Sequence, residues 1–351
     1  MRSATDVWPC AGSKAMGDRL PSTVSREKTF AAYDGQEASG PLSRLYLDLM
    51  DEQKRTWPTL RRAYASLRTT MDREIRCTGF LVRVQHNPGR IASTIARVKG
   101  GATDGRPCFL CQRNLPPQQR GILYCGSWVI LPNPMPVFPF HSTVAHVRHQ
   151  HQGISGNMEV FLGLIGDLGD EWTILYNGPR CGASAPDHLH FQVVPSGLLP
   201  VETEIWSPGR LAPLRLKEGA GLYRAIGLGR QAIVLVDHDP GAVAETFQDF
   251  LEALREALSL PEEPMINIVG YRKEGRTVLV VFPRRKHRPD AFFRTGDDRI
   301  LLSPAVVEMA GVLVAPAEAD FRRLDAHAVE ALFDEVSLEA ELLDKALRAI
   351  G

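Results

Sequence analysis

The stretch that most constrains this chain runs from Asn177 to Pro195 and reads NGPRCGASAPDHLHFQVVP. Polar and apolar residues alternate over its second half, which is typical of a β-strand with one buried face. A strand over residues 187–194 would place three polar side chains on one face: His188, His190 and Gln192. The apolar residues between them would point the other way, into a core. The pattern therefore predicts a sheet with a polar, ligand-capable face.

A run of small residues directly precedes this strand. Gly182, Ala183 and Ser184 leave room for backbone N–H groups to approach phosphate oxygens, and Ser184 adds a hydroxyl. Arg180 lies nearby in the sequence and can neutralise negative charge. A phosphate site at the start of the strand is therefore expected.

The order Gly-Ala-Ser followed by His-x-His-x-Gln resembles the transferase branch of the histidine-triad superfamily. That branch includes galactose-1-phosphate uridylyltransferase, diadenosine tetraphosphate phosphorylase and GDP-hexose phosphorylase. The resemblance implies an α+β, histidine-triad-like fold, with a mainly antiparallel sheet flanked by helices and two related halves around one site. It makes His190 the nucleophile that forms a covalent nucleotidyl-histidine, and Gln192 the ligand of a non-bridging phosphate oxygen. Glutamine cannot transfer protons, which fits transfer to a phosphate acceptor rather than to water.

The same resemblance gives roles to residues outside the motif. Asn133 and His141, eight residues apart, match the strand entry of the superfamily, so His141 is expected to hydrogen-bond near the nucleophile. Asn177 lies thirteen residues before His190, as in the uridylyltransferase pattern, and is expected to contact phosphate or ribose. The alternative for Asn177 is a structural Asn-Gly turn with Gly178.

Cys108 and Cys111 have the spacing of two thiolate ligands of tetrahedral zinc. In the uridylyltransferase-like pattern the other two ligands would be His149 and His188. We therefore expect a structural Zn²⁺ that ties the cysteine loop to the catalytic strand, although two unpaired thiols in a reducing compartment would have the same spacing. GDP-hexose phosphorylases of the plant and animal form lack this cysteine pair. Magnesium is a second candidate cofactor, for charge neutralisation.

Composition limits the function classes. The 351 residues carry 41 basic and 41 acidic side chains, so no overall positive field favours nucleic acid. No apolar run is long enough to cross a membrane, and the N-terminus lacks the apolar core of a signal peptide. Six cysteines in a chain of this length do not indicate a disulfide framework. The sequence predicts a cytoplasmic protein, monomeric or homodimeric, that binds neither nucleic acid nor membrane.

Three parts are expected along the chain: a flexible extension over 1–40, a catalytic half over 41–199 and a second half over 200–351. Apolar periodicity predicts helices at 42–71 (divided at Pro58), 158–168, 242–258, 326–335 and 338–350. Alternation and turn residues predict strands at 78–85, 121–124, 127–131, 141–149, 172–176, 187–194, 232–236, 265–271 and 276–282.

The second half adds further resemblance. In the phosphorylases a strand that ends in Pro-Arg lies near the phosphate end of the substrate, so Arg284, Arg285 or Lys286 is expected on the incoming phosphate. Residues 304–311 (PAVVEMAG), followed by Asp320-Phe321 and residues 335–338 (EVSL), closely resemble the C-terminal part of GDP-hexose phosphorylases. The same region is also similar, less fully, to diadenosine tetraphosphate phosphorylases.

The sequence thus predicts a nucleotidyltransferase (phosphorylase) that takes a nucleotide or nucleotide-sugar substrate, of GDP-hexose type, and inorganic phosphate. Diadenosine tetraphosphate phosphorylase and hexose-1-phosphate uridylyltransferase are alternatives with the same chemistry. A nucleotide-binding module of this fold without turnover is the alternative of another class. A zinc-stabilised nucleic-acid-binding protein is disfavoured by the balanced charge.

Overall fold

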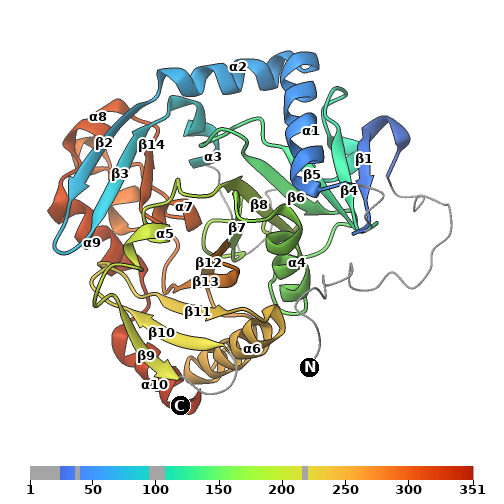
Figure 1. The fold of residues 1–351 in the computed structure, drawn as a ribbon. Helices are drawn as coiled ribbons and strands as arrows, with labels where there is room; N and C mark the ends of the chain where they lie inside the picture. The colour runs from blue at the N-terminus through green and yellow to red at the C-terminus, as the bar shows by residue number, and fades with distance from the viewer. Residues whose placement is uncertain (1–23, 36–39, 95–106, 216–219, 351) are drawn as a thin grey trace.

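A computed structural model describes residues 24–35, 40–94, 107–215 and 220–350 (Figure 1). The fold is α+β, with one large sheet, one small sheet and flanking helices, as the sequence predicts. Within the described ranges, none of the helices has both the length and the apolar character needed to span a bilayer.

The large sheet has eleven strands in the order β1-β4-β5-β6-β8-β7-β12-β13-β11-β10-β9. Every neighbouring pair is antiparallel except β1 with β4. In chain order its strands are β1 (Thr29–Tyr33), β4 (Gly121–Tyr124), β5 (Trp128–Pro132), β6 (Ser142–His146), β7 (Trp172–Asn177), β8 (His190–Pro195), β9 (Leu211–Arg215), β10 (Gly221–Ala225), β11 (Ile233–Asp237), β12 (Ile266–Lys273) and β13 (Arg276–Pro283).

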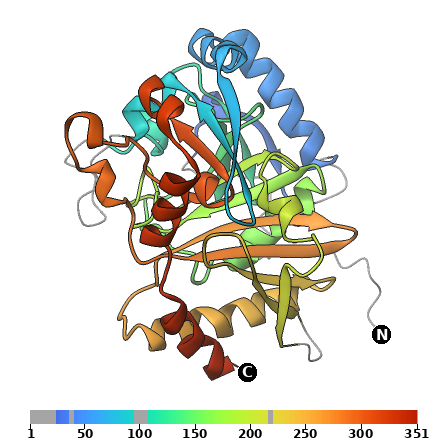
Figure 2. The same ribbon diagram turned by 90° about the vertical axis from the view of Figure 1, so that its left-hand side faces the viewer.

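The small sheet and the helices complete the fold. The small sheet, in the order β14-β3-β2, contains β2 (Met71–Arg76), β3 (Leu81–His86) and β14 (Val312–Ala315). β2 and β3 form an antiparallel hairpin. Figure 2 shows this hairpin and β14 from the side on which they stand in front of the large sheet. The helices are α1 (Leu42–Thr56), α2 (Pro58–Ser66), α3 (Ile91–Thr94), α4 (Met158–Leu168), α5 (Val201–Glu204), α6 (Pro240–Ala257), α7 (Val306–Met309), α8 (Glu318–Arg323), α9 (Ala326–Val336) and α10 (Ala340–Ile350).

Two halves of the large sheet repeat one connectivity. The chain passes through β4, β5, β6, α4, β7 and β8, and later through β9, β10, β11, α6, β12 and β13. The spatial order of the second set is the mirror image of the first, and the two sets meet where β7 pairs with β12. The sheet therefore consists of two related halves, although no repeat is visible by eye in the sequence.

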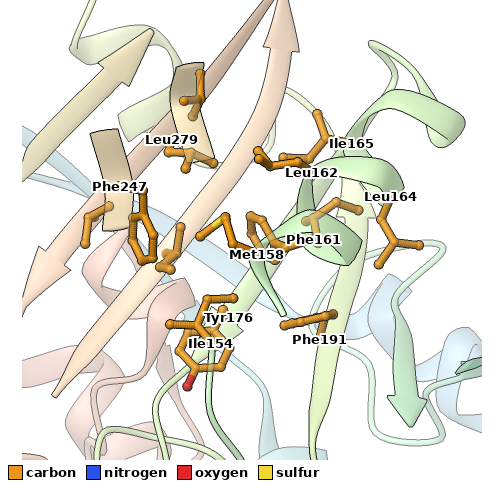
Figure 3. Close-up of a cluster of buried hydrophobic side chains, with 14 of the residues drawn as sticks. Ile154, Met158, Phe161, Leu162, Leu164, Ile165, Tyr176, Phe191, Phe247 and Leu279 are labelled. Atoms are coloured by element: carbon orange, nitrogen blue, oxygen red, sulfur yellow. The ribbon is translucent and has the colours of Figure 1, made fainter. Parts of the chain in front are cut away.

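Helices α4 and α6 cover one face of this sheet, on which the larger core cluster lies. In Figure 3, Phe161, Leu162 and Ile165 of α4 pack against Phe191 of β8 and Leu279 of β13. The alternation predicted for the central motif is confirmed here, because its odd-numbered residues (Leu189, Phe191, Val193) all join this core. The opposite face of the second half is covered by a separate cluster that includes α7, α9 and the small sheet.

Two predicted strands are shorter than expected, with consequences for the site. β8 begins only at His190, because the His188 N–H bonds to the Ala185 carbonyl in a turn, so His188 lies in the preceding loop and not on the strand face. β6 covers only Ser142–His146, which leaves His141 just before the strand and His149 beyond it.

The predicted N-terminal extension also needs correction. Residues 29–33 form β1, which pairs in parallel with β4, and the ring of Tyr33 stacks on that of Tyr124 with centroids 5.8 Å apart. The polar residues around this short segment give no strand periodicity, so the sequence did not reveal it. Most of the rest of the predicted extension, residues 1–23 and 36–39, lies outside the described residues. The last residue of the predicted first helix, Met71, begins β2 instead.

Gly270 of β12 lets α4 approach the sheet. A Cβ atom there would lie 2.5 Å from a ring atom of Phe161 and 2.6 Å from a methyl of Ile165. We expect Gly270→Val to lower the free energy of unfolding by about 2–3 kcal/mol, since overpacking forces the helix away from the sheet. Gly166→Ala, on the exposed face of α4 with open space around it, is the control and should be neutral or slightly stabilising. Urea denaturation of both variants measures this, and equal stabilities would contradict the packing argument.

Candidate functional site

A pocket of about 460 Å³ opens on the face of the first half that is opposite to α4. Its floor comes from β5, β6, β8 and the end of β7, through Leu131, Thr143, His190, Gln192 and Asn177. The loop that carries Cys108 and Cys111 (residues 107–118, the cysteine loop) forms one wall, and the residues around α7 form another. Seven of the predicted site residues line this pocket: Asn133, His141, Asn177, Gly182, Ser184, His190 and Gln192. Ala183, between two of them in the chain, is buried and does not line it.

The ring of His190 is buried and held in one tautomer. Its Nδ1 lies 2.7 Å from the His188 carbonyl oxygen, which can only accept a hydrogen bond. Nδ1 must therefore carry the proton in the neutral ring, and Nε2 keeps its lone pair. Burial lowers the pKa of His190 to about 4, so the ring is neutral near pH 7. A neutral imidazole with a free Nε2 is the form that can act as a nucleophile.

The amide of Gln192 is oriented by a chain of hydrogen bonds. The Val137 N–H donates to His141 Nδ1 at 3.2 Å, so the neutral His141 ring carries its proton on Nε2. His141 Nε2 then donates to Gln192 Oε1 at 2.8 Å. Because Oε1 is the acceptor of this bond, the Gln192 NH₂ group is the end left to donate. Burial lowers the pKa of His141 to about 4, which keeps this ring neutral as well.

Gln152, which the sequence did not suggest, ties the catalytic strand to its neighbour. Its Oε1 accepts from the His190 N–H at 2.8 Å, and its Nε2 donates to the carbonyl oxygens of His190 and Asn177 at 2.9 and 2.8 Å. One buried amide side chain therefore fixes the backbone of both residues where β7 and β8 begin to separate. A glutamine in a loop has no periodicity that would have indicated this role.

Asn177 is held from the second half of the chain. Its Oδ1 accepts from the Val306 N–H at 2.7 Å and from Asn267 Nδ2 at 2.8 Å. Asn267 in turn accepts from Arg284 Nη1 at 2.5 Å and donates to the Cys181 carbonyl at 2.8 Å. This network fixes both ends of the loop 177–182. Gly182 at its end has φ of +112°, and a Cβ there would lie 2.4 Å from that of Ala305, so only glycine fits.

The basic side chains that the sequence analysis assigned to phosphate binding lie outside the pocket. Arg284 is 2% exposed, and its donors bind Asn267 and four backbone carbonyls (Val336, Pro304, Lys286, His287). Arg285 pairs with Glu339 at 2.7 Å, Lys286 with Glu335 and Asp290, and Arg180 with Glu262 at 2.6 Å. None of the four lines the pocket. Sequence position alone could not show that carboxylates and carbonyl oxygens of the protein already bind these basic side chains.

Two charged residues that the sequence analysis missed do line the pocket. Arg90 is the last residue of the short helical turn Pro88–Arg90, and its Nη1 donates to the Met135 carbonyl at 2.6 Å. Glu308 lies on α7 and is 8% exposed, and burial raises the pKa of its carboxyl to about 7. Both reach the pocket through long-range packing, although Glu308 belongs to the segment 304–311 that the resemblance singled out.

Cys108, Cys111, His149 and His188 converge beside the pocket, with all four ligand atoms within 4.8 Å of one another. Sulfur and nitrogen atoms lie 3.3 Å apart for Cys108 with His188, and 3.2 and 3.6 Å apart for Cys111 with His149 and His188. A tetrahedral zinc would place such ligand atoms about 3.5 Å apart. The residues therefore fit a zinc ion.

The outer contacts of the two histidines fit the same reading. Each turns Nδ1 toward the cysteines. His188 Nε2 bonds to the His146 carbonyl at 2.8 Å, and His149 Nε2 lies 3.5 Å from an Asp187 carboxylate oxygen. Metal-bound histidines commonly donate their second N–H to such acceptors, which fixes the tautomer and ring orientation. The cluster therefore has both the ligand set and the supporting contacts of a Cys₂His₂ site.

Comparisons with known proteins agree with this fold. A family model described as a domain of unknown function (DUF4922) matches residues 49–195, which include most of the pocket floor and the cysteine–histidine cluster. No curated protein matches the sequence.

Crystal structures of yeast Ap4A phosphorylase Apa2 are similar to this chain. The complex with AMP has a TM-score of 0.53 at 15% identity and covers 83% of this chain and 96% of its own. The complex with Ap4A has a TM-score of 0.51 at 13% identity and covers 82% and 97%. This chain therefore shares the fold of that phosphorylase over 82–83% of its own length.

The cysteine–histidine cluster leads to a metal prediction. We expect the purified protein to contain about one zinc per chain by elemental analysis. Cys111→Ser should lose the metal and lower the unfolding midpoint by roughly 5–10 °C. Without the metal, its binding free energy no longer stabilises the folded state. Cys77→Ser, at a free thiol outside the cluster, is the matched control and should keep the metal. Metal-free wild-type protein that cannot take up zinc would contradict the assignment.

His287, a partly buried histidine near two arginines, predicts a pH dependence of stability. Burial and the nearby charges of Arg288 and Arg284 lower the pKa of His287 to about 3, against about 6.5 in an unfolded chain. Unfolding therefore takes up a proton between these values, so this contribution to stability is complete above about pH 6.5 and is lost as the pH falls toward 3. Near pH 5, His287→Asn should reduce the slope of the free energy of unfolding by about 1.4 kcal/mol per pH unit. Urea titrations over this range measure the slope, with exposed His327→Asn as control; an unchanged slope in His287→Asn would contradict the argument.

Proposed function

We propose that this chain is a nucleotidyltransferase that works through a covalent nucleotidyl-histidine at His190. The observation that carries the proposal is the arrangement of His190: its Nδ1 proton is bound to the His188 carbonyl, so Nε2 is the reactive end in a pocket. The fold shared with Ap4A phosphorylase supports the same class of reaction.

In the first step, His190 Nε2 attacks the α-phosphorus of a nucleoside diphosphate compound and displaces its leaving group. The Gln192 amide, the Ser184 hydroxyl and the backbone N–H groups of residues 182–184 would stabilise the charge on the phosphate oxygens. In the second step a phosphate acceptor takes the nucleotidyl group from the ring. His190 Nε2 carries no proton in the neutral ring, so it can attack the phosphorus and later be released without a proton transfer. This fits the lowered pKa values that keep the buried rings of His190 and His141 neutral.

Cys108, Cys111, His149 and His188 would hold a structural zinc, and Asn133 would shape the turn that presents His141. The Asn133 N–H donates to the His141 carbonyl at 3.0 Å, which fixes that turn. In this proposal residues 41–199 form the catalytic half, and residues 200–351 hold its loop in place through Asn267 and Arg284.

For the substrate we favour phosphorolysis of a nucleotide sugar of GDP-hexose type, because residues 304–311 resemble GDP-hexose phosphorylases and line the pocket through Ala305, Val307 and Glu308. Ap4A phosphorolysis is the second candidate, since the yeast enzyme of that activity has the same fold. The cysteine pair favours hexose-1-phosphate uridylyltransferase instead. The base remains for experiment to assign.

The test is intact-mass spectrometry after brief incubation with GDP-, UDP- and ADP-sugars and with Ap4A. We expect wild-type protein to gain the mass of one nucleoside monophosphate, in an acid-labile linkage, from one of these donors. His190→Ala should lose the adduct and at least a thousandfold of turnover while it keeps its folded circular dichroism spectrum, because the nucleophile is absent.

Exposed His327→Ala, on α9 and away from the pocket, is the control and should form the adduct at the wild-type rate. Nucleotide binding without an adduct from any donor would contradict the transferase and favour a binding module of the same fold.

A further inference from the structure

The lining of the pocket differs in chemistry from part to part. Around the cysteine loop it is apolar, with Phe109, Leu110, Leu115 and Leu131. Arg90 and Glu308, whose charges attract each other, are the only arginine or lysine and the only acidic residue among the described residues that line the pocket. His190 and Gln192 lie on the floor of the same pocket, on β8. An apolar lining suits a nucleobase, which leaves the charged pair for another part of the ligand.

Arg90 lines the same pocket as His190 and Gln192, where it can meet a phosphate bound between them. Burial, and to a smaller extent the charge of Arg90, lower the pKa of His141, which bonds directly to Gln192. The Met135 carbonyl accepts from Arg90 Nη1, which fixes one edge of the guanidinium against the pocket wall. A phosphorylated ligand needs at least one cation, and none of Arg180, Arg284 and Arg285 lines the pocket.

Glu308 lines the same pocket and interacts electrostatically with Arg90. Its Oε2 accepts from the Ala305 N–H at 2.9 Å at the start of α7, which fixes the side chain in one orientation. Above its pKa of about 7 the ionised carboxylate has acceptor positions for further hydrogen bonds, and hydroxyl groups are the donors that suit it. In this ionised form it would repel a second phosphate. The carboxylate therefore favours a ligand that carries hydroxyl groups beside a single phosphate.

We propose that Arg90 and Glu308 form the subsite for a phosphorylated sugar, in which Arg90 binds the phosphate and Glu308 accepts hydrogen bonds from the sugar hydroxyls. This inference rests on the proposed function and assigns its leaving group. In the reverse direction, a phosphate oxygen of a sugar 1-phosphate attacks the nucleotidyl-histidine. A P–O bond forms, the P–Nε2 bond breaks, and its electron pair returns to the ring. Inorganic phosphate would bind at Arg90 in the forward direction, with no use of Glu308.

Equilibrium binding tests the subsite without any turnover. Isothermal titration calorimetry compares glucose 1-phosphate with inorganic phosphate on wild-type protein, Glu308→Gln and Arg90→Gln. Glu308→Gln keeps an oxygen that can accept from the Ala305 N–H, so the start of α7 should be preserved. We expect it to weaken glucose 1-phosphate about tenfold, the effect of one charge-assisted hydrogen bond, and to leave inorganic phosphate unchanged. Arg90→Gln should weaken both ligands tenfold or more.

Other outcomes would overturn the assignment. Equal weakening of both ligands by Glu308→Gln, no weakening of either, or no binding of glucose 1-phosphate to the wild type would each exclude the sugar subsite. The adduct assay on the same proteins separates the two proposals. A nucleotidyl adduct in wild-type protein that shows no such discrimination would leave the transferase standing and remove only the sugar subsite. Discrimination without an adduct would do the reverse.

Discussion

The pairing of β7 with β12 is the interaction on which the candidate site depends. It joins the two related halves into one sheet, and it places Asn177 opposite Asn267 at the end of the pair. That register brings a side chain from the second half under the loop that precedes the catalytic strand. Arg284, at the end of the neighbouring β13, then fixes Asn267. The second half therefore acts on the site by holding the first, through buried polar groups whose bonding capacity is largely met inside the protein.

The two halves share a connectivity but not their chemistry. On β8 the face toward the pocket carries His190 and Gln192. On β13, which occupies the equivalent place in the second half, the corresponding face carries Val278, Val280 and Phe282, all buried in the second core cluster. The face that is a pocket in one half is thus filled by apolar packing in the other. This difference explains why, among the described residues, this face of the sheet carries a candidate site in the first half and none in the second.

Local patterns predicted the elements and residues whose role follows from nearby sequence. Period-two alternation identified the inward face of β8, and the helix Met158–Leu168 and the hairpin of β4 and β5 were also predicted closely. The spacing of Cys108 and Cys111, read with the family pattern, pointed to the histidines that converge on them.

What the sequence could not supply depends on contacts between distant segments. Arg90 and Glu308 meet the pocket only through the fold, and Arg284 is withdrawn from it because backbone carbonyls occupy its donors. A charge run has the same appearance in the sequence whether its side chains face a ligand or the protein interior.

The position of His188 connects the cysteine–histidine cluster to His190, the proposed nucleophile. Its Nδ1 faces the two cysteines, its Nε2 bonds to the His146 carbonyl, and its own carbonyl accepts the Nδ1 proton of His190. His188 is outside the strand, so the ladder of β8 does not hold this carbonyl in place. Loop hydrogen bonds of the Leu189 and His188 N–H groups to the Gln150 and Ala185 carbonyls hold it together with the side-chain cluster, and a bound zinc would fix it more firmly. A structural metal at this place would therefore help to select the tautomer of His190 from two residues away, through the His188 carbonyl alone.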